Sequence, residues 1–441
     1  MAKRKERIIL QADTTKIQGY EQAGTLEGWR DEVSRLCVGN HRLILGISTS
    51  FAAPLLHHLD QQGFGINYFG ASSIGKTTVL RVGKSVIGDH ASIMTWLSTA
   101  TALESVAAQY NDGMLPLDEM GEADPKIIGA TAYMLANGQG KMRNTRNIIL
   151  RPTLKWRLVF QSTGEITLAG SLAQVNQKVK AGQAVRLADL PADAGAGLGI
   201  FDRLPEGFNN GAEFADYLKD ATKQQHGHTF VEYLTQLTKD LPTHIQTVRD
   251  FRAEWLQQYL PKDADSQVRR VAGSFATICA GGELATDFGL TGWPEGAAGE
   301  SAAVCFNAWV QQRGGVGNQE QADILSHVQN HFQEHGAAKY AYINIRPQDD
   351  KTMYRMGYKD DAGDFFVLPN RFEAELCRAG GFDKKQVIKV LQEHGYLLPG
   401  GDGRPTISKR VYSLDLEDSL NAEKKKTTRV YHIDSSVVGG D

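Results

Sequence analysis

The sequence predicts an α/β fold with a parallel sheet near its N-terminus, a helical region after it and a smaller C-terminal domain. Three observations predict this organisation. An apolar run at residues 66–69 is followed by a glycine-rich turn and then by a helical pattern from Thr77 to Val86. Strand-like and helical runs then alternate as far as residue 191, which is typical of a parallel sheet with covering helices. From Ala212 to Arg313 the pattern is helical throughout, and a mixed pattern closes the chain.

Length and composition are those of a soluble globular protein. The 441 residues predict two to four domains at about 100–200 residues each. No apolar run approaches the roughly 18 residues of a membrane helix, and the basic start lacks the apolar region of a secretory signal. We therefore expect a cytoplasmic protein without membrane contact. The net charge of −3 means that any nucleic acid would have to be bound by local basic clusters. The four scattered cysteines, Cys37, Cys279, Cys305 and Cys377, predict buried free thiols.

The strongest motif is a phosphate-binding loop. The segment GASSIGKTT at residues 70–78 fills every specified position of G-x-x-x-x-G-K-[ST] between a predicted strand and a predicted helix. Its backbone N–H groups would surround nucleotide phosphates, Lys76 would reach the β and γ oxygens, and the Thr77 hydroxyl would ligate Mg²⁺. The alternative is a glycine-rich turn without a ligand, but the complete motif favours ATP and Mg²⁺ as cofactors. The predicted nucleotide-binding residues are Gly70, Ala71, Ser72, Ser73, Ile74, Gly75, Lys76, Thr77 and Thr78.

Two acids follow the next strong strand pattern. The run Met114 to Leu117 ends in Asp118 and Glu119, about 40 residues after Lys76. At this place in a phosphate-loop protein, the aspartate would join the Mg²⁺ shell and the glutamate would activate the attacking water. An acidic turn after an ordinary strand is the alternative. Pro116 is unusual for a central strand, because proline cannot donate to the ladder.

A basic tip lies between a predicted helix at 124–136 and a third predicted strand at 156–160. Lys141, Arg143 and Arg146 carry three positive charges with no acid between them. The tip could grip nucleic-acid phosphates, or it could be a solvated hairpin. The sequence leaves both interpretations open.

Three further arginines are candidates for a nucleotide site. Arg186 opens the strand-like run at 184–191, Arg203 follows a flexible glycine loop, and Arg270 opens the best helix of the region 211–313. Arg270 stands where a cation could face a nucleotide, whereas Arg186 and Arg203 are each more often surface ion-pair residues. Arg186 and Arg203 matter for catalysis only where a neighbouring subunit's γ-phosphate lies opposite.

The C-terminal pattern at residues 319–418 predicts a winged helix, reached through a glycine-rich linker at 311–318. Helices at 371–378 and 384–394 precede two strands, 396–398 and 410–414, that bracket a Gly/Pro turn. Lys384, Lys385 and Arg410 would form a basic face toward the DNA backbone. Contact with another protein is the alternative. Residues 1–30 are interpreted as an N-terminal arm and residues 419–441 as a flexible tail.

Together these segments resemble a bacterial family catalogued as domain of unknown function 927, found on phages, plasmids and other mobile elements. The matching segments are GASSIGKTT at 70–78, LPLDE at 115–119, NGQGKMR at 137–143, GQAVRLADLPA at 182–192 and RRVAGSFATICAGGELA at 269–285. The resemblance implies an AAA+ ATPase core at 31–210, a helical lid at 211–313 and a winged helix, related to MCM-like replicative helicases.

The same resemblance implies roles for individual residues. Nucleotides would lie between subunits of a ring, usually a hexamer, with Arg186 or Arg203 supplied in trans and Arg270 as a sensor. The basic tip would be a pore hairpin. One departure is that the third strand ends in Ser162 and Thr163, where the MCM-like pattern has asparagine as its polar sensor.

The leading hypothesis is an ATP-dependent DNA helicase that replicates a mobile element. The alternative is a DNA-binding initiator or assembly factor in which ATP only switches conformation. No zinc ribbon, oligonucleotide-binding fold or primase acids are seen upstream, so a loader, primase or polymerase would be a separate partner or be absent.

Overall fold

The computed structural model describes residues 19–141, 153–345, 350–352, 354–412 and 425–439, and the chain forms two compact units, Met1–Gly317 and Asn318–Asp441. The first unit contains a five-stranded parallel sheet in the order β2-β3-β4-β1-β5. Its strands are β1 (Phe64–Phe69), β2 (Met94–Thr95), β3 (Met114–Asp118), β4 (Val159–Gly164) and β5 (Leu187–Pro191). The predicted parallel α/β architecture is confirmed for this unit.

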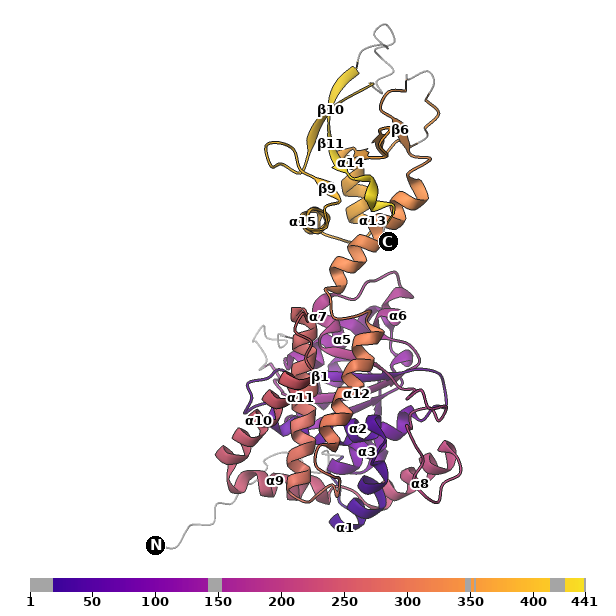
Figure 1. Cartoon of the computed structure of the whole chain (residues 1–441). Helices are drawn as coiled ribbons and strands as arrows, with labels where there is room; N and C mark the ends of the chain where they lie inside the picture. Colours follow the sequence, from indigo (N-terminus) through magenta and orange to yellow (C-terminus); the bar gives the residue numbers. More distant parts are fainter. Residues whose placement is uncertain (1–18, 142–152, 346–349, 353, 413–424, 440–441) are drawn as a thin grey trace, which may run out of the picture. The chain divides into compact units, whose positions relative to one another are not determined.

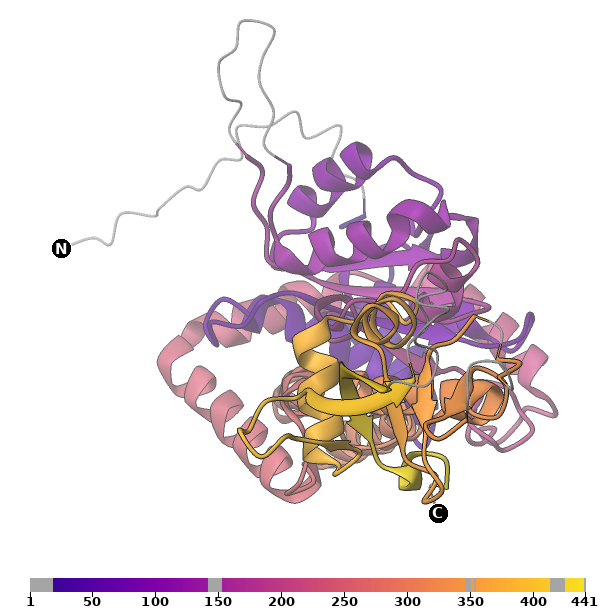
Figure 2. The same cartoon turned by 90° about the horizontal axis from the view of Figure 1, so that it is seen from above.

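Helices cover the sheet on both sides (Figure 2). The helices between the strands are α3 (Lys76–Ile87), α4 (Ala100–Gln109), α5 (Pro125–Asn137), α6 (Leu168–Ala173) and α7 (Ala181–Ala184), and α2 (His41–Ala52) precedes the sheet. The short helix α1 (Leu26–Trp29) comes before α2. Side chains from the sheet and these helices form one apolar core, in which Ile66, Val79 and Leu117 are fully buried.

The third predicted strand lies further along the chain than expected. We predicted residues 156–160, but β4 runs from Val159 to Gly164. Trp156 lies outside the parallel sheet, and its N–H donates to the Gly138 carbonyl instead. Polar residues can occupy this buried strand because they have partners. The Gln161 amide donates to the Gly46 carbonyl at 2.6 Å, and the Trp96 indole donates to the Ser162 hydroxyl at 2.9 Å.

Pro116 lies within β3, although β3 has neighbours on both sides. The short strand β2 pairs only with Leu117 and Asp118. On that side, no β2 residue lies opposite Pro116, so the missing N–H of the proline breaks no hydrogen bond of the ladder. On the other side Pro116 lies opposite Gln161 of β4. The proline is therefore accommodated where the ladder on one side has not yet begun.

Residues 211–312 form the helices α8 (Gly211–Gln224), α9 (His228–Lys239), α10 (Leu241–Tyr259), α11 (Ser266–Asp287) and α12 (Ala297–Gln312). The helical pattern predicted for this region is confirmed. The apolar side chains of these helices belong to the same hydrophobic core as those of the sheet. Helix α11 packs closely on α2 (Figure 1). A Cβ atom on Gly281 would lie 2.7 Å from the Ala52 backbone nitrogen, so glycine permits this close helix crossing.

Part of the predicted N-terminal arm is instead built into the first unit. Trp29 of α1 is fully buried, and its indole donates to the Ser85 hydroxyl of α3 at 2.8 Å. The Ala23 and His226 backbones pair as an isolated bridge. The sequence pattern missed these contacts because all of them join distant parts of the chain.

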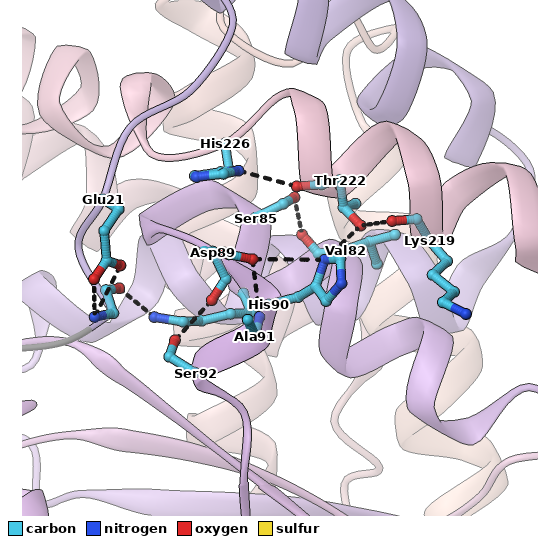
Figure 3. Close-up of polar contacts among 12 residues, drawn as sticks. Glu21, Val82, Ser85, Asp89, His90, Ala91, Ser92, Lys219, Thr222 and His226 are labelled. Atoms are coloured by element: carbon cyan, nitrogen blue, oxygen red, sulfur yellow. Dashed lines mark hydrogen bonds and ion pairs between the residues drawn. The ribbon is translucent and has the colours of Figure 1, made fainter.

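A buried lysine fixes the segment before α1 to the far end of α3. The Lys84 ammonium donates to the Gly19 carbonyl and lies over the rings of Tyr20 and Tyr110, 5.5 and 5.2 Å from their centroids. Burial lowers the pKa of Lys84 to about 7. Close by, the Thr222 hydroxyl and a ring nitrogen of His90 are 3.2 Å apart (Figure 3).

The second unit contains a six-stranded sheet in which β10, β11, β8, β7 and β6 follow one another and β9 also pairs with β11. Its strands are β6 (Tyr340–Tyr342), β7 (Gly357–Lys359), β8 (Phe365–Val367), β9 (Leu397–Leu398), β10 (Ile407–Tyr412) and β11 (Lys425–Ile433). Its helices are α13 (Gln319–His335), α14 (Pro369–Arg371), the π-helix η7 (Phe372–Arg378) and α15 (Lys384–Glu393).

The prediction of a flexible tail at 419–441 is wrong for residues 425–439. Strand β11 pairs with β8, β9 and β10, and Val430, Tyr431 and Ile433 are buried. The strands predicted to bracket a turn, β9 and β10, therefore both pair with β11. The segment is rich in polar residues and has no clear strand pattern. It forms a strand because it pairs with three strands that are distant in sequence.

Candidate nucleotide-binding site

The phosphate-binding loop connects β1 to α3 at the carboxyl edge of the sheet. Gly75 begins the turn into α3 with φ of 91°, a left-handed conformation that favours glycine. A Cβ atom there would also lie 2.7 Å from Cγ2 of Ile200. The Ile200 N–H donates to the Ile74 carbonyl at 2.8 Å, so the segment after β5 supports the loop.

Lys76 lies folded over this loop. Its ammonium donates to the carbonyls of Gly70 and Ala71 at 2.8 and 2.6 Å. Partial burial lowers the pKa of Lys76, and the carboxylates of Glu165, Asp118 and Glu119 oppose that shift. The structure thus brings the predicted lysine and the two predicted acids to the same edge of the sheet.

Thr163 joins the two acids. Its hydroxyl donates to Oδ1 of Asp118 and accepts the Glu119 N–H at 3.0 Å. The Glu119 N–H also lies 3.2 Å from Oδ1 of Asp118. The strand order makes these contacts possible, because β4, which carries Thr163, lies between the strand of the loop and the strand of the acids. Sequence reasoning assigned Thr163 no definite role.

Glu119 has an unusual backbone and a perturbed acidity. Its φ of 57° places a non-glycine residue in the left-handed region, which is sparsely populated and recurs at functional sites. A hydrogen bond with Glu122 and repulsion from its charge raise the pKa of Glu119. A raised pKa makes the carboxylate a better proton acceptor near neutral pH.

The candidate arginines lie at different edges of the sheet. Arg186 precedes β5, and its carbonyl accepts the Gly65 N–H at 2.7 Å, which places it at the amino edge beside the start of β1. Arg203 follows β5 and lies exposed, three residues after Ile200, which bonds to the phosphate-binding loop. A strand of six residues rises roughly 3.3 Å per residue, so the two edges are roughly 15–20 Å apart.

Arg270 is exposed in the first turns of α11 and is not brought to the phosphate-binding loop of its own chain. Thr277 of the same helix donates at 2.6 Å to Gln61, which precedes β1 at the amino edge. At about 1.5 Å per residue, Arg270 lies about 10 Å further along the helix, away from the carboxyl edge.

The basic tip is described only at its base. Gln139 and Lys155 form an isolated bridge, and the Gly140 N–H donates to the Leu154 carbonyl at 3.0 Å, an antiparallel pairing. Lys141 is exposed, and its N–H lies 3.3 Å from Oε1 of the buried Glu104. Arg143 and Arg146 lie outside the described residues.

The predicted DNA contacts of the second unit have unequal surroundings. Lys384 is paired with Glu373 at 3.3 Å, whereas Lys385 and Arg410 are exposed. Arg410 is opposite Thr427, and Arg429 is opposite Ser408 two positions away, so the two arginines share one face of the β10–β11 ribbon. Arg429 was not predicted, because its segment was interpreted as part of the tail.

All four cysteines are free and buried, as predicted. Among the residues that the structure describes, no helix combines the length and apolar character needed to cross a membrane.

Two comparisons found similarity to known proteins. The family model described as Domain of unknown function (DUF927) matches residues 1–152, which confirms the resemblance for that part of the chain. Among solved structures, "SCCmec type IV Cch - active helicase" is similar, with a TM-score of 0.65 and 19% identity. The match covers 96% of this chain and 73% of that chain, and at this identity it establishes likeness of fold. A search of curated proteins gave no match.

Proposed function

We propose that this chain is an AAA+ ATPase that acts as a DNA helicase or translocase in the replication of a mobile element. The observation that carries the proposal is the meeting of Lys76, Asp118, Glu119 and Thr163 at the carboxyl edge of the parallel sheet. The similarity in fold to a protein named as an active helicase of an SCCmec element supports it.

The residues at this edge fit ATP with Mg²⁺. The Thr77 hydroxyl and the Asp118 carboxylate are oxygen donors of the kind that Mg²⁺ takes together with nucleotide phosphates. Oδ1 of Asp118 already accepts from Thr163 and Glu119, which fixes the orientation of the carboxylate. When bound, Mg²⁺ would neutralise charge on the phosphates. Lys76 would leave the carbonyls of its own loop and bind the β and γ oxygens.

Glu119 is the group we assign to water activation. Its raised pKa suits a proton acceptor, and its side chain is exposed beside the aspartate of the metal site. The MCM-like pattern has an asparagine as its polar sensor at the end of the third strand. Thr163 would take that role here, because its hydroxyl contacts both the Asp118 carboxylate and the Glu119 N–H.

A neighbouring copy of the chain would complete the site in a ring, which we propose to be a hexamer. An apolar groove of about 300 Å³ lies beside Glu122, the partner of Glu119. Leu97 and Ile127 line it with 70% and 42% of their surfaces exposed. Such a surface suits burial by a second subunit. Arg186 or Arg203 and the sensor Arg270 would then face a nucleotide held by the next copy.

DNA would be contacted by the basic tip and by the second unit. Lys141, Arg143 and Arg146 would hold a strand inside the ring, and helix α15 with the β10–β11 ribbon would be the winged-helix surface. Lys385, Arg410 and Arg429 are exposed on this surface, whereas the charge of Lys384 is already engaged by Glu373.

The test is ATP hydrolysis with and without DNA, together with displacement of a labelled strand from a fork. We expect DNA to stimulate hydrolysis and the strand to be displaced only by a protein that turns ATP over, with Glu119→Gln as the inactive control. Hydrolysis or binding of ATP without strand displacement would favour the alternative, a DNA-binding initiator or assembly factor that ATP only switches.

A further inference from the structure

The guanidinium of Arg186 is held in a cradle made by α5 and α7. Its Nη1 donates to the Gly182 carbonyl at 2.9 Å, and its carbon lies 4.3 Å from the centroid of the Tyr133 ring. Nη2 reaches Oε1 of Gln62 at 3.4 Å. Tyr133 belongs to α5 and is partly exposed, so the ring and the cation meet at the protein surface.

This cradle orients the cation without neutralising it. Within the described part of the chain, no carboxylate forms an ion pair with Arg186, and its Nε is buried without a hydrogen-bond partner. A cation over an aromatic face is attracted by the ring quadrupole and keeps its full charge. Arg186 is therefore positioned by Tyr133 and Gly182 and remains available to bind an anion.

The position of Arg186 suits a site on another subunit. In a ring built from head-to-tail contacts, each subunit uses two different surfaces, one for each neighbour. The nucleotide residues occupy the carboxyl edge of the sheet, whereas Arg186 lies at the amino edge, beside the start of β1. Arg203 lies instead at the same edge as its own phosphate-binding loop.

We propose that Arg186 is the arginine supplied in trans and that Tyr133 is its positioning residue, holding the guanidinium for the γ-phosphate of the neighbouring subunit. This inference rests on the proposed ATPase function. Tyr133 itself takes no part in the reaction. The ring only limits the directions that the arginine side chain adopts, so that less conformational freedom is lost in the transition state.

The test compares Tyr133→Leu, which keeps apolar bulk but removes the quadrupole, with Tyr133→Phe, which keeps the ring. Cation–π attraction predicts a roughly 3- to 30-fold fall in turnover for Tyr133→Leu, unchanged ATP affinity, and near-parental turnover for Tyr133→Phe. Arg186→Ala should lose more, on the order of 10³-fold. Thermal unfolding of each variant checks that the exposed substitution has not disturbed the fold.

Mixing separates a role in trans from a structural one. Lys76→Ala subunits cannot bind ATP but carry an intact Tyr133 and Arg186, so adding them should restore part of the turnover of Tyr133→Leu. If Arg186→Ala hydrolysed ATP at the parent rate, the inference about Arg186 and Tyr133 would be overturned, and the shared-site part of the proposed function would fail only if Arg203→Ala matched the parent as well. If Arg186→Ala were inactive but Tyr133→Leu matched the parent, only the positioning role would be overturned. Equal losses in Tyr133→Leu and Tyr133→Phe, or no recovery on mixing despite subunit exchange, would overturn it as well.

Discussion

The two edges of the parallel sheet differ in the charges that they carry. The carboxyl edge holds Lys76 among the acids Asp118, Glu119 and Glu165, and these groups influence one another's ionisation. Arg203 follows β5 at the same edge. The amino edge holds Arg186, and Arg270 lies further along α11 on the same side. Among the described residues neither arginine is paired with a carboxylate. The difference teaches that one edge gathers the residues that we propose bind a nucleotide, whereas Arg186 and Arg270 on the other side are suited to an anion on another molecule.

The largest expected effect is at the carboxyl edge. Lys76→Ala should abolish ATP binding, because the charge of the β and γ phosphates is no longer neutralised. Glu119→Gln should keep ATP binding and stop turnover, because the amide cannot accept a proton from water. Binding of a fluorescent ATP analogue and release of phosphate would separate the two variants. Hydrolysis by Glu119→Gln at the parent rate would contradict the assignment of Glu119.

The contact between the strands at this edge should have the next largest effect. Thr163→Val keeps the shape of the side chain but removes the hydroxyl that bonds Asp118 and the Glu119 N–H. Hydrogen bonds to charged groups contribute about 1.5–3 kcal/mol, so turnover should fall roughly 10- to 100-fold. Thr163→Ser, which keeps the hydroxyl, is the matched control. If valine and serine behaved alike, the hydroxyl would have no part in the site.

At the amino side, Arg270 and its neighbour Arg269 form a matched pair. The Arg269 guanidinium donates to the carbonyls of Ala264 and Lys262 at 2.9 and 2.8 Å, so its hydrogen bonds lie within its own chain. We expect Arg270→Ala to lower turnover about tenfold. This corresponds to the lower end of the range of about 1.5–3 kcal/mol that a hydrogen bond to a charged group contributes. Arg269→Ala should leave turnover within about twofold. Steady-state ATPase rates check both, and equal rates for the two variants would remove Arg270 from the site.

The smallest expected effect concerns Lys84, the buried cation at the far end of α3. Its pKa is lowered from 10.5 to about 7 by burial. Between these values the unfolded chain binds a proton that the folded chain does not, so stability rises with pH across this window. Below the window both states bind the proton, so Lys84 adds no pH dependence there. The slope is at most about 1.4 kcal/mol per pH unit.

Denaturation at pH 7, 8 and 9 would measure this contribution. As the pH increases, the free energy of unfolding of the parent should rise relative to that of Lys84→Met, which has no titrating group at position 84. The exposed Lys219 provides a control, because Lys219→Met should follow the parent at each pH. A constant difference between the parent and Lys84→Met would mean that Lys84 stays protonated in the folded protein.

The sequence by itself determined the elements whose signals are contiguous. The phosphate-binding loop, the Asp118–Glu119 pair and the helical region after residue 211 each depend on neighbouring residues and could be predicted, because loop chemistry and helical periodicity are local. The tertiary structure alone decided which residues meet across the chain. It placed Thr163 between the two acids through the strand order, set Arg186 on Tyr133 at the opposite edge, and recruited β11 into the second sheet. Strand pairing and helix packing join residues that are distant in sequence, so no local pattern specifies them.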